Sequence, residues 1–134
     1  MSLMKVFNIS GSAVSAQSQR LNVVASNLAN AEAVAGPDGQ SYKARQVVFQ
    51  STPAPDGSAG VRGSTIAALP APPKRVFEPG HPMADAQGYV TQSNVNVVEE
   101  MVNMISASRS YQNNVEVMNT ARALLQKTLQ MGQS

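Results

Sequence analysis

Apolar residues recur with a seven-residue spacing in the last third of the chain. The positions are Val97, Met101, Met104, Tyr111, Val115, Met118, Leu125 and Leu129, and Val98, Val102 and Ile105 widen the stripe in its first half. A seven-residue apolar repeat is typical of a helix that packs along another helix. The pattern therefore predicts one long helix over residues 94–131.

Local signals support this helix at both ends. Asn96 followed by Glu99 resembles a capping arrangement, and Glu99 and Glu100 suit the positive end of the helix dipole. Lys127 suits the negative end, and Gly132 is a natural stop. The signals predict a single continuous helix in this segment.

A second, shorter repeat lies near the N-terminus. One series is Phe7, Val14, Leu21 and Leu28, and the offset series is Ser10, Gln17, Val24 and Ala31. The pattern predicts a helix over residues 8–33, with Ser10 as its N-cap. The sequence Ala35-Gly36-Pro37-Asp38-Gly39 should end it.

The segment between the helices, residues 36–93, has a different composition. All eight prolines lie in it. Four short runs in it resemble strands: Tyr42–Phe49, Val61–Ala67, Lys74–Phe77 and Gly88–Thr91. They predict a small antiparallel hairpin or an extended β-ribbon, with Ser51–Gly60 as a mobile loop tip.

These segments define the expected architecture. The fold class is mainly α with a small β insertion, in which antiparallel N- and C-terminal helices form a coiled-coil-like hairpin. Residues 1–35 supply the first helix of an inner coiled-coil domain, residues 36–93 the Pro/Gly-rich middle, and residues 94–134 the second helix. Both termini should lie on the same side.

The helices carry few charges. Residues 94–131 contain six charged side chains against fourteen Asn, Gln, Ser or Thr. A solvated helix usually has the opposite balance, because Lys and Glu favour helix and solubility whereas Asn, Ser and Thr do not. Amides and hydroxyls can be buried against a neighbour without burying net charge. We therefore expect marginal helices that become fully ordered only in a helical assembly.

This interpretation assigns interface residues. In the stretch ASNLANA, Leu28 should lie in the seam between the helices, whereas Asn27 and Asn30 should face other subunits. The expected helix–helix and subunit-interface residues are Val14, Leu21, Val24, Asn27, Leu28, Asn30, Val97, Met101, Met104, Ile105, Tyr111, Val115, Met118, Leu125 and Leu129.

Composition excludes several functional classes. The net charge of the 134 residues is only +2, and without a Lys/Arg run we expect no nucleic-acid partner. The chain has no cysteine, so it forms no disulfide and has no thiolate chemistry. We expect neither a cleaved signal peptide nor a transmembrane segment.

Candidate catalytic and metal-binding residues are isolated. His81 and Asp85 lack a second His or a Cys to complete a metal site, and Ser10-Gly11-Ser12 lacks a nucleophile elbow. A peptidoglycan hydrolase would need paired carboxylates, but Glu99 and Glu100 are adjacent and point about 100° apart on a helix. We expect no cofactor and no enzyme. A coiled-coil adaptor that binds a single partner helix stays the alternative.

Several motifs together resemble a known family. They are SNLANA within Ser15–Ala33, YKARQVVF at Tyr42–Phe49, EPGHPMADAQGYV at Glu78–Val90, and the block from Asn94 into Glu99-Glu100-Met101. They are similar to the axial proteins, rod and hook, of the bacterial flagellum. Length and the central segment favour the C-type proximal rod subunits over the B-type subunit and the longer rod and hook proteins.

The resemblance implies a structural subunit of the proximal rod of the basal body, which spans the periplasm. Such a subunit would leave through the flagellar type III export apparatus and polymerise helically with copies of itself and other rod subunits. The resulting drive shaft would transmit torque and enclose the export channel. Contact with the rotor ring or the bushing around the rod is left open.

Overall fold

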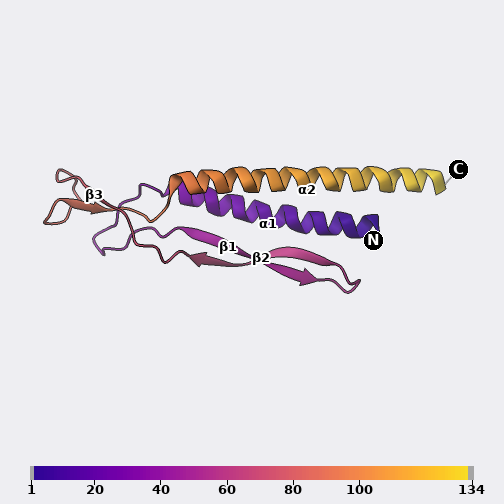
Figure 1. The fold of residues 1–134 in the computed structure, drawn as a ribbon, viewed down its shortest axis with the longest axis horizontal. Coiled ribbons are helices and arrows are strands. Elements are labelled where there is room, and N and C mark those ends of the chain that lie inside the picture. The colour runs from indigo at the N-terminus through magenta and orange to yellow at the C-terminus, as the bar shows by residue number, and fades with distance from the viewer. Residues whose placement is uncertain (1, 133–134) are drawn as a thin grey trace.

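The computed structural model describes residues 2–132, in which two helices enclose four short strands in sequence. The elements are α1 (Leu3–Ala29), β1 (Arg45–Pro53), β2 (Ala59–Ala68), β3 (Arg75–Phe77), β4 (Tyr89–Thr91) and α2 (Val97–Gly132). Figure 1 shows an elongated molecule in which α1 and α2 lie side by side and antiparallel, with both chain ends at one end. The prediction of two terminal helices with a small antiparallel β middle is confirmed.

Helix α1 begins earlier than the sequence pattern predicts. Ser2 is its N-cap, because its Oγ accepts a hydrogen bond from the backbone N–H of Lys5 at 3.2 Å. Ser10, the predicted cap, is instead buried in the middle of the helix. The prediction was wrong because residues 3–9 gain tertiary contacts with α2, which outweigh a local capping signal. At its other end α1 stops at Ala29, before the expected Pro/Gly segment.

The strands β1 and β2 form a hairpin that lies along α1. They pair antiparallel, with a shift in register between Val48 and Phe49. Ser12 Oγ on α1 accepts a hydrogen bond from the backbone N–H of Val61 at 3.0 Å. Near the tip of the hairpin, Lys5 Nζ donates to the carbonyl of Asp56 at 3.1 Å. Helix α1 is therefore covered by α2 on one side and by the hairpin on another (Figure 1).

Two glycines allow β2 to approach α1 closely. A Cβ added to Gly60 would lie 2.9 Å from Ser12 Oγ. One added to Gly63 would collide with the Gln19 side chain and lie 2.9 Å from Val47 Cγ1. Such distances are below ordinary van der Waals contact, so a larger residue requires a shift of the neighbouring side chains or of the strand itself.

Half of the predicted loop tip at residues 51–60 is strand. Ladder pairing continues from Ser51 opposite Val61 to Pro53 opposite Ala59. The turn is confined to Ala54–Ser58, where Asp56 Oδ1 accepts hydrogen bonds from both the N–H and the hydroxyl of Ser58. The side-chain turn and the continued pairing together shorten the loop, which composition alone did not indicate.

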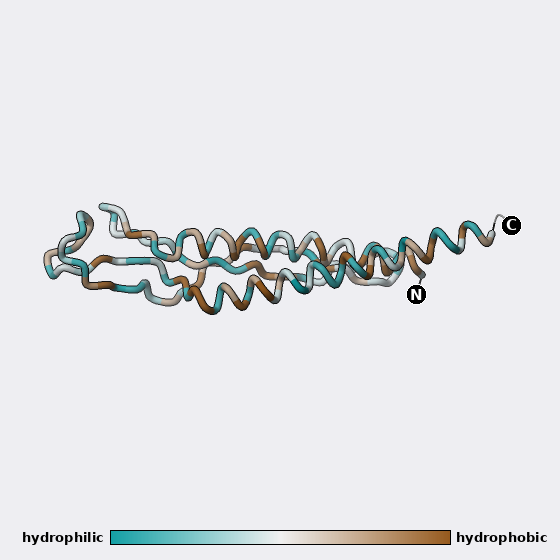
Figure 2. Tube along the Cα trace, turned by 90° about the horizontal axis from the view of Figure 1, so that it is seen from above, coloured by the Kyte–Doolittle hydropathy of each residue, from teal (hydrophilic) through white to brown (hydrophobic). Residues whose placement is uncertain are grey.

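A small buried cluster lies where α1 ends and α2 begins. Ala31, Ala44 and Val95 form a buried cluster against which Tyr42 and Leu69 pack. Strands β3 and β4 form a second small sheet at the end of the molecule far from the termini (Figure 1). Along both helices hydrophobic and hydrophilic residues are interspersed, and the C-terminal end of α2 projects past the start of α1 (Figure 2).

Candidate functional site

Asn27 is the centre of a buried polar junction between α1, β1 and α2. Its side chain is fully buried. Nδ2 donates to the carbonyl of Arg45 at 2.8 Å and to Glu100 Oε2 at 3.1 Å. Oδ1 accepts from the Tyr42 hydroxyl at 2.8 Å and from the backbone N–H of Arg45 at 3.0 Å. The carboxamide therefore uses both of its donors and both of its acceptor sites inside the chain.

The prediction that Asn27 faces other subunits was wrong, whereas that for Asn30, which is half-buried, stays a prediction. Asn27 is directed into the junction, and Asn30 closes α1, with Nδ2 donating to the carbonyl of Ser26 at 2.9 Å. Both asparagine side chains bind backbone groups, Asn27 at the start of β1 and Asn30 at the end of α1. A one-dimensional pattern does not distinguish an amide buried within a chain from one buried between chains.

The second part of the junction was missed by sequence reasoning. Asn94 Oδ1 accepts a hydrogen bond from the N–H of Ala44 at 2.6 Å, and its Nδ2 donates to the carbonyls of Leu69 and Ala71. Ser93 is fully buried and donates to the carbonyl of Ala31 at 2.6 Å. The available signal was an Asn and a Ser directly before a capped helix. The two residues attach the start of α2 to three other segments.

The two adjacent glutamates of α2 have different surroundings. Glu99 is exposed, and its N–H donates to Asn96 Oδ1 at 3.2 Å, so the predicted cap is confirmed. Glu100 is only 5% exposed and receives the hydrogen bond of Asn27. It also lines a cavity of about 280 Å³ with Arg20 and Arg45. Glu100 therefore belongs to the junction rather than to the solvated first turn.

The predicted residues of α1 divide by position. Val24 is buried, while Val14, Leu21 and Leu28 are half-buried. All four lie on a helix that has neighbours on two sides, α2 and the hairpin. The structure thus buries one of these residues fully and the other three partly within a single chain.

The predicted residues of α2 fall into two groups. In the second half of the stripe, Tyr111, Val115, Met118 and Leu125 are half-buried. In the first half and at the C-terminal end, Val97, Met101, Met104, Ile105 and Leu129 are exposed. The buried residues of α2 are instead Glu100, Ala107 and Ala121. Because alanine has a small side chain, α1 and α2 can approach closely, while the larger apolar side chains lie to the sides or outside.

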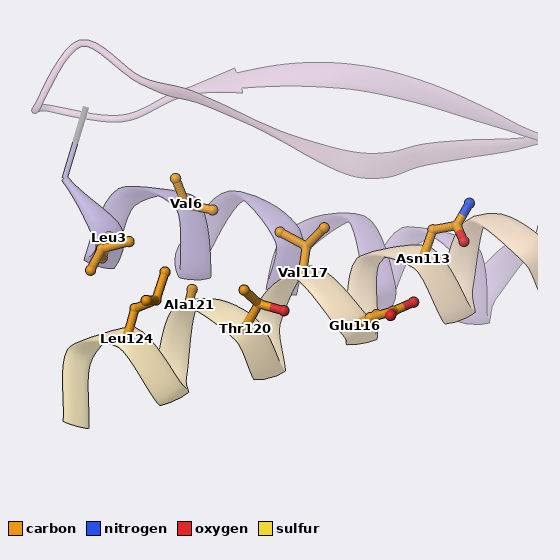
Figure 3. A pocket seen from close by; sticks show the side chains of 8 residues that line it. All are labelled: Leu3, Val6, Asn113, Glu116, Val117, Thr120, Ala121 and Leu124. Carbon is orange, nitrogen blue, oxygen red and sulfur yellow. The ribbon is translucent and has the colours of Figure 1, made fainter. Parts of the chain in front are cut away.

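Hollows flank the contact between the helices near the termini. One of about 470 Å³ lies between Leu3 and Val6 on α1 and Val117 and Leu124 on α2. Figure 3 shows Leu3 opposite Ala121 and Leu124. Another of about 170 Å³ has Phe7 and Leu129 in its lining. The helix pair therefore leaves apolar surface open along both sides of its seam.

His81 and Asp85 have structural roles in the turn before β4. His81 Nδ1 accepts the N–H of Met83 at 3.0 Å. Asp85 forms an ion pair with Arg75, and its Oδ1 accepts the N–H groups of Gln87 and Tyr89. Hydrogen bonding from the Tyr89 backbone, then from Gln87, and the charge of Arg75 hold the pKa of Asp85 below its ordinary value. Among residues 2–132 no group of three His, Cys, Asp or Glu side chains is placed to hold a metal ion.

Two family models match the parts of the chain that contain the two helices, and individual relatives match nearly the whole chain. Residues 7–37 match the family model "Flagella basal body rod protein", and residues 86–131 match "Flagellar basal body rod FlgEFG protein C-terminal". "Flagellar basal-body rod protein FlgC" of Yersinia enterocolitica is 61% identical over 134 residues, which cover 99% of this chain and all of the relative. The protein of the same name from Salmonella typhimurium is 58% identical with the same coverage. That of Buchnera aphidicola from Acyrthosiphon pisum is 49% identical over 132 residues, 96% of this chain and 97% of the relative.

The chain belongs to the FlgC family of flagellar basal-body rod proteins. It is a structural subunit of the rod and is located in the flagellar basal body. Neither helix described here combines the length and the apolar character that crossing a membrane requires. For a FlgC-family subunit, the surfaces of interest are those that contact neighbours in the rod.

Proposed function

We propose that this FlgC-family chain polymerises helically with other rod subunits and with copies of itself, and that assembly completes its fold. The observation that carries the proposal is the arrangement of α2. Its inward positions are Ala107 and Ala121, whereas Val98, Val102 and Ile105 are more than half exposed. Among residues 2–132 it packs along α1, and only its first turns approach β1. Surface of this kind is buried when further helices pack against it.

We assign each of the three segments a position in the rod. Residues 1–35 and 94–134 form an inner layer of coiled-coil-like helices near the axis of the shaft, and residues 36–93 form a smaller outer part. The elongated shape supports this division, because the helices are parallel to the long axis and the β segments lie beside and beyond them (Figure 1). Long helices with many neighbours resist twisting, as transmission of torque through a hollow shaft requires.

The composition of the interior suits export in an unfolded form. The buried apolar residues are alanines and valines, which remove little area from water compared with Leu or Phe. A subunit with this interior unfolds readily, so it can pass through the channel of the flagellar type III export apparatus. The hydrogen-bonded junction around Asn27 then fixes where the hairpin lies on the helices. No catalytic step is assigned to the chain, and its outer segment is the part proposed to meet the surrounding rotor ring or bushing.

Hydrogen exchange measured by mass spectrometry on the purified chain and on isolated rods tests the proposal. We expect rapid exchange in both helices of the free chain at low concentration, and strong protection of the same residues in rods. A free chain with helices as well protected as in the rod would refute assembly-coupled ordering. A discrete small complex with one partner helix, in place of a polymer, would support the adaptor alternative.

A further inference from the structure

Three consecutive residues in the interior of α1 are poor helix formers. They are Ser10, Gly11 and Ser12, and the helix continues on both sides of them. Glycine is the least favourable residue for a helix interior after proline, and serine competes with the helix for backbone hydrogen bonds. The hydroxyl of Ser12 does so here, because its Oγ donates to the carbonyl of Ile9 at 2.7 Å. The helical backbone of α1 is therefore weakened at residues 10–12.

Packing against α2 does not require a glycine at position 11. A Cβ added to Gly11 would lie 3.6 Å from Met118 Cε and 3.9 Å from its Sδ, which is ordinary van der Waals contact. The φ angle of Gly11 is not positive, so other residues can adopt its backbone conformation without strain. At Gly63, in contrast, an added Cβ would collide with Gln19. Gly11 thus affects the stability of the helix and not its fit against α2.

The parts of α1 on either side of these three residues are held differently. None of residues 3–9 is buried, and every buried residue of the helix lies at position 10 or beyond it. Lys5 ties the first part to the tip of the hairpin through an exposed hydrogen bond. The second part has a buried hydrogen-bond anchor, because Asn27 binds into the junction. We call residues 3–9 the α1 arm and residues 13–29 the α1 body.

The contact between the α1 arm and α2 is loosely filled. Leu3 and Val6 line the hollow of about 470 Å³, and Met4 and Phe7 line the one of about 170 Å³. Figure 3 shows Leu3 at the start of α1 opposite Leu124. An apolar side chain beside a hollow has fewer neighbouring atoms and gains less dispersion energy. A segment with few buried apolar contacts and exposed hydrogen bonds opens more readily than the rest of a structure.

We propose that residues 10–12 are a built-in break in α1, at which the α1 arm opens from α2 and from the tip of the hairpin while the α1 body stays packed. The inference concerns the single chain and goes beyond the proposed polymerisation. Opening of the arm uncovers the end of α2, where Leu124 and Leu125 line the same two hollows. The other end of the helix pair stays fixed by the junction around Asn27. The helix pair thus has one rigid end and one adjustable end.

Hydrogen exchange in isolated rods tests the inference, with rates resolved separately for the arm and the body. We expect the arm to exchange about tenfold faster than the body. Gly11→Ala should slow exchange in the arm about fivefold and leave the body unchanged, because it strengthens the helix at the break. Ser15→Ala, an exposed substitution within the body, is the control and should leave the arm unchanged. Equal protection of arm and body, or the same change in both in Gly11→Ala, would show that α1 opens as one unit and would overturn the inference.

Thiol labelling provides a second, independent measurement, because the chain has no cysteine of its own. Val6→Cys and Val14→Cys place single thiols at half-buried positions of the arm and the body. We expect the thiol of Val6→Cys to react about tenfold faster than that of Val14→Cys, and added Gly11→Ala to slow the first reaction alone. Equal reaction rates of the two thiols, or a rate for Val6→Cys that Gly11→Ala does not lower, would overturn the inference.

Discussion

The Nδ2 atom of Asn27 lies 3.1 Å from Oε2 of Glu100 and donates a hydrogen bond to it in the interior of the chain. This contact joins the end of α1 to the first turn of α2. The same amide also binds both backbone groups of Arg45, where β1 starts. One side chain therefore determines the relative position of three elements, and its loss should affect all of them.

The first prediction concerns removal of this amide. Asn27→Ala leaves the Glu100 carboxylate and the backbone of Arg45 without their partner in a buried site, and an unsatisfied buried polar group costs about 1–3 kcal/mol. We expect the free energy of unfolding of the assembled subunit to fall by about 3 kcal/mol, with loss of hydrogen-exchange protection in β1. Asn22→Ala, at an exposed position of α1, is the matched control and should change little. Equal protection in the two variants would show that the junction does not hold the hairpin.

The second prediction concerns the close approach of β2 to α1. In Gly63→Ala the new Cβ would lie 2.9 Å from Val47 Cγ1 and would collide with Gln19. Overpacking of this kind costs about 1–3 kcal/mol, so the hairpin should move away from the helix. Gly80→Ala is the control, because a Cβ there meets nothing within 4 Å.

Hydrogen exchange of residues 59–68 would measure this displacement. Faster exchange in Gly63→Ala than in Gly80→Ala is the expected result. If Gln19→Ala in the Gly63→Ala background restores part of the protection, the collision with Gln19 is the cause. Identical exchange in all these variants would contradict the close packing of β2 on α1.

Sequence reasoning predicted the elements better than their neighbours. Periodicity located both helices, and the β-branched runs located four strands, because these signals are local. The side of the helix to which each polar residue points could not be predicted from these local signals. Leu28 and Asn27 are adjacent, yet it is Asn27 that is fully buried, because an amide can satisfy the backbone groups of Arg45 and a leucine cannot.

The inward side of α2 was unpredictable for a related reason. Hydrophobicity favours Met101 and Ile105 for the interior, but the close approach of α1 selects Ala107 and Ala121. In a chain that folds alone the larger residues would be expected inside. The exposed large residues are consistent with an interior that continues into neighbouring subunits, and such neighbours cannot be deduced from the pattern of one chain.

The third prediction concerns the pH dependence of the turn before β4. The pKa of Asp85 in the folded chain is lower than its ordinary value of 3.8, chiefly because the Tyr89 backbone N–H binds the charged form. The charged form therefore stabilises the turn above the ordinary value, and this contribution is lost as the pH falls through the lowered pKa. Amide chemical shifts of Gln87 and Tyr89 should change in that acidic range, and in Asp85→Asn this transition should be absent. Shifts that titrate at or above the ordinary pKa would contradict the assignment.

The fourth prediction concerns charge placed in the contact between the helices. Leu28 and Val115 are both half-buried apolar residues of the predicted seam. In Leu28→Asp or Val115→Asp the new carboxylate must lose hydration when helices pack around it, without an obvious counter-ion, and the energetic cost of such burial is high. We expect both variants to be made and exported but to form no rods, so that the cells do not swim. Ser18→Asp, at an exposed position of α1, controls for added charge and should leave motility normal. Normal swimming of both seam variants would refute the assignment of these residues to a packed interface, whereas loss of motility in Ser18→Asp as well would show that the helix tolerates no added charge at all.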